Sequence, residues 1–112
     1  MKITKLGEFE ELVLMVVIVL KDEAYGVSIK SELEERLGNS LSVGSIQSAL
    51  KRMEEKGFLT SELGEATNKR GGKRKRIYAA TTQAFRTLEE LREIRKNLWD
   101  AFPKLAFGHA MA

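Results

Sequence analysis

The chain has 112 residues, of which 43% are hydrophobic and 31% are charged, so we expect one soluble domain with a modest core. It contains no cysteine, which excludes disulfides and thiolate metal sites. Its longest apolar run, Leu12 to Leu20, is shorter than the roughly 20 residues that cross a bilayer. No signal-peptide pattern precedes this run. We therefore expect a cytoplasmic protein, and no residue pattern indicates a metal or another cofactor.

The net charge of +3 is unevenly distributed along the chain. Between Ser42 and Arg76 there are nine lysines and arginines and four glutamates, a net charge of +5. The remainder has ten basic and twelve acidic residues, a net charge of −2. A basic segment on a slightly acidic body is typical of a protein that binds phosphates. A solvated charged loop is the alternative interpretation of the charge pattern alone.

The segment from Leu6 to Leu20 is predicted to be a helix that begins amphipathic and becomes apolar on all sides. Its acidic start suits the positive end of the helix dipole. The β-branched run from Val16 to Val19 would also suit a buried strand, but the acidic start and the length favour a helix. An entirely apolar helix must be covered on more than one side. We expect a second subunit to cover part of it, through Phe9, Leu12, Val13 and Val16.

Two further helices with a short connection follow, which is the pattern of a helix-turn-helix pair. The first runs from Ser28 to Leu37 and supports the second, which runs from Val43 to Lys56. Ser42 can cap the second helix and Gly57 can end it. Its apolar residues recur at helical spacing and form one buried stripe: Ile46, Ala49, Leu50 and Met53. Its opposite face carries side chains that can form hydrogen bonds outward: Ser45, Gln47, Ser48, Lys51 and Arg52.

Two extended runs after this helix, Phe58 to Gly64 and about Arg74 to Thr81, predict an antiparallel hairpin. Gly71 and Gly72 give its loop backbone freedom. The tip and exit of the hairpin are rich in cations: Lys69, Arg70, Lys73, Arg74, Lys75 and Arg76. Because side chains alternate across a strand, we expect about half of these cations to face the same side. A helix with a short polar outer face followed by a basic two-stranded wing indicates DNA binding.

Thr81 or Thr82 begins a last helix, which is predicted to run to about Phe102. Its apolar stripe is longer than a small domain can cover, so we expect it to pair with a partner helix in a homodimer. The interface residues expected on it are Leu88, Leu91, Leu98, Trp99 and Phe102. The predicted fold is mainly α with a small β-hairpin wing. It comprises a winged helix-turn-helix domain at residues 1–81 and a C-terminal dimerisation helix and tail at residues 82–112.

Several motifs between Leu12 and Leu88 carry a resemblance to a known family. They are Tyr25-Gly26-Val27-Ser28-Ile29, Ser42-Val43-Gly44-Ser45-Ile46, the run from Ala49 to Gly57, the run from Arg70 to Tyr78, and Thr81. In this order and spacing they resemble the PadR family of bacterial winged-helix transcriptional regulators. The chain length suggests the short branch of the family, with one C-terminal helix.

The resemblance implies a homodimer whose first and last helices pack across the two-fold axis. It also implies two reading helices in successive major grooves and, usually, repression of nearby genes. Some short members bind flat aromatic molecules in a pore between the subunits, which makes Trp99 and Phe102 candidate effector-binding residues. The family often has Tyr-Pro where this chain has Gln47-Ser48, so base readout by that tyrosine cannot be transferred. Ala84 replaces a common glycine, which affects only the start of the last helix.

The candidate DNA-binding residues have different expected roles. The small residues Gly44, Ser45 and Ser48, which follow Ser42, allow close approach to a duplex, and Gln47 can pair bidentately with adenine. Lys51 and Arg52 suit phosphates, although one of them could pack its stem on the domain instead. In the wing, Arg70 or Arg74 could enter a narrow minor groove. Tyr78 is expected in the core or strand rather than as a platform for base stacking.

Other functions compete with DNA reading as interpretations of the sequence. A winged-helix module that binds an acidic protein partner, without specific DNA binding, would use the same surface. A first helix lying on a membrane is disfavoured because its polar half is acidic rather than rich in lysine and arginine. Gly71-Gly72-Lys73-Arg74 is not a P-loop, because the upstream glycine and the Ser/Thr are missing. No nucleophile–base pair is evident, so the sequence argues against an enzyme.

Overall fold

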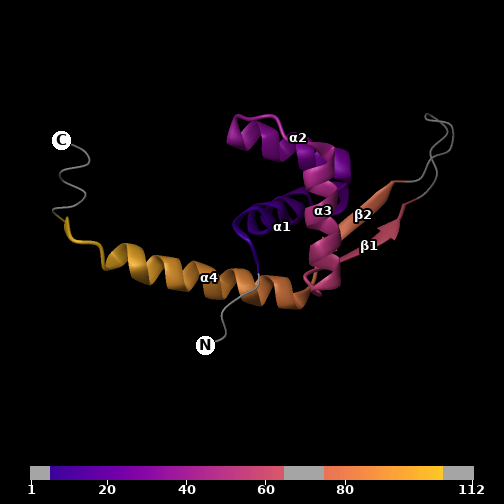
Figure 1. Cartoon of the computed structure of the whole chain (residues 1–112). Helices are drawn as coiled ribbons and strands as arrows, with labels where there is room; N and C mark the ends of the chain where they lie inside the picture. Colours follow the sequence, from indigo (N-terminus) through magenta and orange to yellow (C-terminus); the bar gives the residue numbers. More distant parts are fainter. Residues whose placement is uncertain (1–5, 65–74, 105–112) are drawn as a thin grey trace.

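The computed structural model describes residues 6–64 and 75–104. The elements in chain order are α1 (Glu8–Leu20), a 3-10 turn η1 (Lys21–Glu23), α2 (Gly26–Leu37), α3 (Val43–Glu55), β1 (Leu59–Leu63), β2 (Arg76–Ala80) and α4 (Thr82–Asp100). Helices and one antiparallel hairpin therefore make up the described chain (Figure 1). The predicted fold class, mainly α with a small β-hairpin wing, is confirmed.

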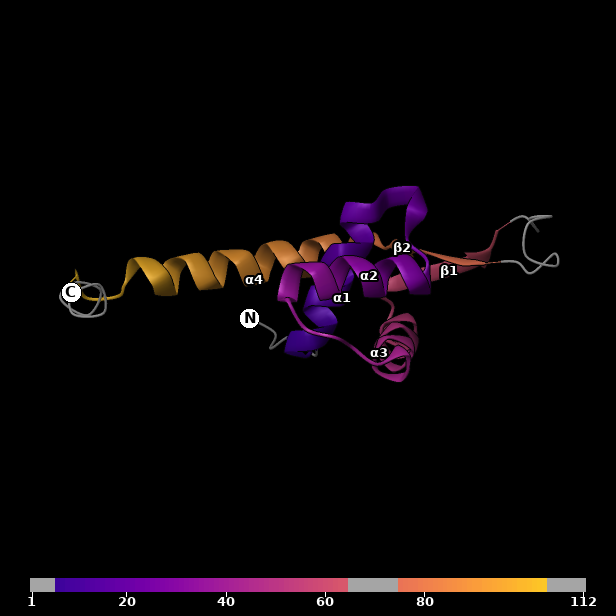
Figure 2. The ribbon, with the colours of Figure 1, turned by 90° about the horizontal axis from the view of Figure 1, so that it is seen from above.

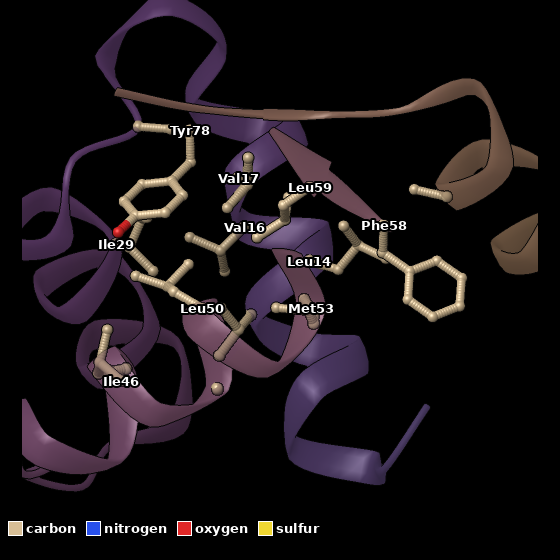
Figure 3. Close-up of a cluster of buried hydrophobic side chains, with 14 of the residues drawn as sticks. Leu14, Val16, Val17, Ile29, Ile46, Leu50, Met53, Phe58, Leu59 and Tyr78 are labelled. Carbon is tan, nitrogen blue, oxygen red and sulfur yellow. The ribbon is translucent and has the colours of Figure 1, made fainter. Parts of the chain in front are cut away.

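Helix α1 lies at the centre of the core and packs against α2, α3 and β2. The run from Val16 to Val19 is helical, so the alternative of a buried strand is excluded. Figure 3 shows how side chains from α1, α3 and the hairpin converge, among them Leu14, Leu50 and Leu59. Val13 and Val16 are also buried within this core. Because their surface is already covered within the chain, these two expected interface residues have almost no area left for a partner.

The helix-turn-helix pair is held by local hydrogen bonds at its connection. Gly38 ends α2 in the left-handed conformation, with a φ of 73°. The Glu34 carboxylate accepts hydrogen bonds from the Leu41 amide at 2.7 Å and from Lys30 at 2.9 Å. Ser42 then caps α3 by accepting a hydrogen bond from the Ser45 amide at 3.0 Å. The connection is short, as the sequence predicted. Its hydrogen bonds set the position of α3 relative to α2.

The hairpin is fixed to the helical core by its second strand. Leu59 pairs with Ala80, Ser61 with Tyr78, and Leu63 with Arg76. The Tyr78 amide donates to the carbonyl of Ala24 at 2.9 Å, and Tyr78 is 6% exposed, which confirms its core position. Ile77 and Ala79 lie on the opposite face of the strand, where Ile77 is partly buried and Ala79 is exposed. The wing is therefore anchored at its base, next to the start of α2.

Helix α4 begins at a Thr81 cap, whose hydroxyl accepts from the Ala84 amide at 3.2 Å. Ala84 is its one buried residue, because the helix then leaves the body of the molecule (Figure 1). Figure 2 shows α4 and the wing projecting in opposite directions. The radius of gyration is 17.2 Å, whereas a compact domain of this length has about 13 Å. Most of the apolar stripe of α4 is thus not covered by the other described residues.

Candidate nucleic-acid interface

The outward face of α3 is the most accessible polar surface of the helix-turn-helix pair. Ile46, Ala49, Leu50 and Met53 are buried and anchor the inner face of the helix. The predicted reading residues on the opposite face are all exposed: Gly44, Ser45, Gln47, Ser48, Lys51 and Arg52. An α-helix is narrow enough to enter a major groove about 12 Å wide. The arrangement can therefore present α3 to base edges without disturbing the core.

Lys51 and Arg52 are neighbours with different surroundings. Among the described residues, Lys51 has no ion-pair partner and its side chain is exposed. The Nε atom of Arg52 instead donates to Oε2 of Glu10 at 3.0 Å, although half of the Arg52 side chain remains exposed. Arg52 is consequently oriented by the protein, whereas Lys51 is an exposed positive charge suited to a phosphate.

Glu10 is a buried carboxylate that connects α1 to α3. Its Oε1 atom accepts from the Gly7 amide at 2.8 Å and from Lys56 at 2.9 Å, while Oε2 accepts from Arg52. Burial raises the pKa of Glu10, but these hydrogen bonds outweigh it and hold the pKa at about 2, below its ordinary value of 4.5. The sequence alone indicates only a favourable helix-dipole position here, because the two cationic partners lie more than 40 residues away.

The described part of the wing contains two of the six predicted cations, and both have intramolecular partners. Nη1 of Arg76 donates to the Ser61 hydroxyl at 3.0 Å, and that hydroxyl donates to the Glu54 carboxylate of α3 at 2.8 Å. The ammonium of Lys75 lies 4.7 Å from the centre of the Tyr25 ring, a cation–π contact. The remaining predicted cations lie outside the described residues: Lys69, Arg70, Lys73 and Arg74. The base of the wing is thus oriented by contacts with α3 and with the start of α2.

A second buried carboxylate, Glu11, connects α1 to α4. Nη2 of Arg95 donates to Oε2 of Glu11 at 2.7 Å, and Nη1 donates to Oε1. This bidentate pair raises the pKa of Arg95. Beside it, a groove of about 430 Å³ between α1 and α4 is lined by Met15, Phe85 and Leu88. Further along α4, the rings of Trp99 and Phe102 lie 4.7 Å apart and are largely exposed.

Among residues 6–64 and 75–104, no group of three acidic, histidine or cysteine side chains is placed to hold a metal ion. In the same residues, no helix is both long enough and apolar enough to cross a membrane.

A helix-turn-helix pair whose second helix is exposed, followed by a two-stranded hairpin on the same core, is a winged helix-turn-helix protein. The sequence model described as the transcriptional regulator PadR-like family matches residues 13–90. The chain belongs to this family of PadR-like transcriptional regulators, as its motifs indicated, and the family consists of regulators rather than enzymes.

Solved structures show the same fold. A PadR family transcriptional regulator from Eggerthella lenta is 27% identical over 88% of this chain and 86% of that one, with a TM-score of 0.66. RosR from H. salinarum is 25% identical over 96% of this chain and 97% of that one, with a TM-score of 0.66. Bacillus subtilis PadR in complex with operator DNA, at 23% identity and a TM-score of 0.60, shares the fold; 75% of this chain matches 46% of that one. No curated protein sequence matches the chain significantly.

Proposed function

We propose that this chain is a sequence-specific DNA-binding regulator that acts as a homodimer on a pseudo-palindromic operator and usually represses transcription. The observation that carries the proposal is the outward face of α3. There, small polar side chains and Lys51 are exposed while the opposite face is anchored by four buried apolar residues. A rigid helix with this surface suits the major groove. The operator complex of the Bacillus subtilis relative, which shares the fold, is consistent with this use.

Different residues are proposed to contribute affinity and specificity. Gln47 and Ser48 are suited to base edges, and the small side chains of Gly44 and Ser45 permit close approach. Lys51 and the wing cations are suited to phosphates, which set the register of the protein on the duplex without reading sequence. The contact of Arg76 with Ser61 keeps that guanidinium at the base of the wing. Because Arg52 forms an ion pair with Glu10, we expect Arg52 to contribute less to phosphate binding than Lys51.

The homodimer is proposed from the uncovered apolar face of α4. Trp99 is 56% exposed and Leu98 is 59% exposed. Met15 on α1 and Phe85 on α4 add exposed apolar area in the groove between these two helices. A two-fold partner would cover this surface with the same surface of a second copy. The partly exposed Phe9, Leu12, Leu88 and Leu91 complete the proposed interface, and Phe102 extends it.

An aromatic effector is a finer part of the proposal. The rings of Trp99 and Phe102 form a tilted aromatic pair with an interplanar angle of 36°, and in a dimer two such pairs would approach each other across the two-fold axis. A flat aromatic molecule bound between them would alter how the subunits pack, and hence the spacing of the two reading helices. Titration of the Trp99 fluorescence with planar aromatic compounds, in the presence and absence of operator, tests this part directly.

The decisive experiment is a binding selection from random duplex DNA, made at low and at moderate salt. We expect enrichment of a two-fold symmetric site whose half-sites are separated by roughly 34–36 Å, one helical turn, or a multiple of it. Retention of every sequence at low salt and of none at moderate salt would contradict the proposal, because counterion release alone produces that behaviour. The protein would then be better explained as an interaction module with a basic surface.

A further inference from the structure

The side chain of Gln47 lies against the backbone of Gly26. A β-carbon added to Gly26 would be 2.7 Å from Nε2 of Gln47 and 4.0 Å from its Cδ. Separations below 3.0 Å are essentially never seen for real β-carbons. Either terminal atom of the amide, nitrogen or oxygen, would occupy this position, so the steric conflict does not depend on their assignment. The Gln47 amide therefore lies in space that any other residue type at position 26 would fill.

Both residues lie where the supporting and reading helices approach each other. Gly26 is the first residue of α2, and Gln47 belongs to the outward face of α3. Together with Val27, Lys30 and Val43 they line an open cleft of about 270 Å³ between these helices. Among the described residues, no hydrogen-bond partner holds the Gln47 amide. Glycine at position 26 thus leaves room for this orientation of the amide, which a β-carbon would exclude.

We propose that Gly26 is a specificity-determining positioning residue, which acts by leaving room for the side-chain conformation in which the Gln47 amide lies against it. This inference rests on the proposed function, because it assigns Gln47 the reading of a base. Bidentate pairing with adenine needs both amide atoms in the plane of the base edge, and each staggered conformation of the side chain aims the amide differently. A methyl group at position 26 would exclude the present conformation and leave the others available.

The substitution Gly26→Ala isolates this effect from effects on folding. The φ angle of Gly26 is not in the left-handed region, unlike those of Gly38 and Gly57, so the backbone accepts alanine. The conflicting atom is the far end of a flexible, exposed side chain, which can move without disturbing the core. Alanine also has a higher helix propensity than glycine. We therefore expect the variant to fold as well as the parent chain, with only the Gln47 amide displaced.

The test compares operator selection by the parent chain, Gly26→Ala, Gln47→Ala and the double variant. A good bidentate pair discriminates between bases by about 5- to 150-fold. We expect Gly26→Ala to change the preference at one position in each half-site by a factor in this range. The dependence of affinity on salt should not change, because the phosphate contacts are retained. In the Gln47→Ala background, adding Gly26→Ala should change nothing further, since neighbouring residues that act through each other are not additive.

Two outcomes with the DNA would overturn the inference. One is that Gly26→Ala selects the same site as the parent chain with the same preferences. The other is that Gly26→Ala alters the preference equally when Gln47 is absent, in which case the added methyl group itself contacts the DNA. If the parent chain selects no site at all, the proposed function fails, and the inference fails with it. If the parent chain selects a site and Gly26→Ala gives one of the two outcomes above, only the inference fails.

A measurement without DNA tests the structural step alone. The chain has two glutamines, Gln47 and Gln83, so the side-chain amide resonances of Gln47 can be assigned by their loss in Gln47→Ala. We expect these resonances to shift in Gly26→Ala while the backbone resonances of α3 keep their positions. Unshifted Gln47 side-chain resonances would overturn the inference whatever the selection experiment gives.

Discussion

Replacing Glu10 by glutamine removes the charge at the junction of α1 and α3 and keeps the shape of the side chain. The carboxylate accepts hydrogen bonds from Lys56, Arg52 and the Gly7 amide at 2.8–3.0 Å. The carbonyl oxygen of glutamine can still accept from Gly7, so the cap of α1 is expected to survive. What the variant loses is the attraction between one buried negative charge and two cations of the reading helix. Glu10→Gln is therefore expected to destabilise the fold.

The size of the loss follows from the pKa of Glu10, which is about 2 in the folded chain against an ordinary value of 4.5. One pKa unit corresponds to about 1.4 kcal/mol, so this difference corresponds to roughly 3 kcal/mol at neutral pH. Half of the Arg52 side chain is exposed, and solvent weakens that part of the interaction. We expect Glu10→Gln to lower the free energy of unfolding by about 2 kcal/mol at pH 7.

The pH dependence provides the assay. Because the pKa of Glu10 is lower in the folded chain than in the unfolded chain, its contribution is complete above pH 4.5 and is lost as the pH falls toward 2. Urea unfolding of the parent chain and of Glu10→Gln, measured at several pH values, should show a difference that is largest at pH 7. The difference in unfolding free energy between the two proteins should diminish as the pH falls from 4.5 toward 2.

Glu8→Gln is the matched control, because Glu8 lies in the same first turn of α1 and is exposed. Its charge interacts with the helix dipole, an effect of about 0.5 kcal/mol. Equal losses of unfolding free energy in Glu8→Gln and Glu10→Gln would refute this explanation. They would mean that the Glu10 charge acts only through the helix dipole. A difference between the parent chain and Glu10→Gln that stays constant down to pH 2 would also refute it.

Three further outcomes are expected. Gly57→Ala should destabilise the chain by about 1–2 kcal/mol, because Gly57 has a φ of 84°; Gly44→Ala, which meets no atom within 4 Å, should cost nothing in the same urea titration. Lys51→Ala should weaken DNA binding for all sequences and lower the salt slope by about one, and equal binding at every salt concentration would contradict this. Trp99→Ala should reduce the light-scattering mass toward that of one subunit at micromolar concentration. Val27→Ala, which changes an exposed apolar residue of α2, should leave the mass unchanged. A single-subunit mass for the parent chain would refute the dimer.

Several helix ends could be predicted because they depend on neighbouring residues alone, whereas α2 begins at Gly26, two residues before the expected Ser28. Ser42 caps α3 through a hydrogen bond to the Ser45 amide, and Thr81 caps α4 in the same way. Gly38 and Gly57 end their helices with positive φ values. Each of these features needs only a side chain and a backbone within a few positions. The order of helices, reading helix and wing followed from such local features, together with the apolar periodicity.

The ion pairs that connect the elements could not be predicted in this way. Glu10 and Glu11 are adjacent in sequence and look alike, yet Glu10 pairs with α3 and Glu11 with Arg95 of α4. Successive residues of a helix point in directions about 100° apart, so adjacent carboxylates reach different partners. Which partner each one meets depends on where the other helices pack.

The sequence by itself determined the kind of protein: a family motif set, local caps and apolar stripes that specify a winged helix-turn-helix. Only the tertiary structure decided which residues of the apolar stripes are buried in the chain's own core and which remain exposed. Periodicity showed that α1 is apolar on all sides, but packing placed Val13 and Val16 in the chain's own core and left Met15 exposed. Packing likewise brought Gly26 against Gln47. Periodicity records which face of a helix is apolar, whereas the partner of that face depends on residues distant in the chain.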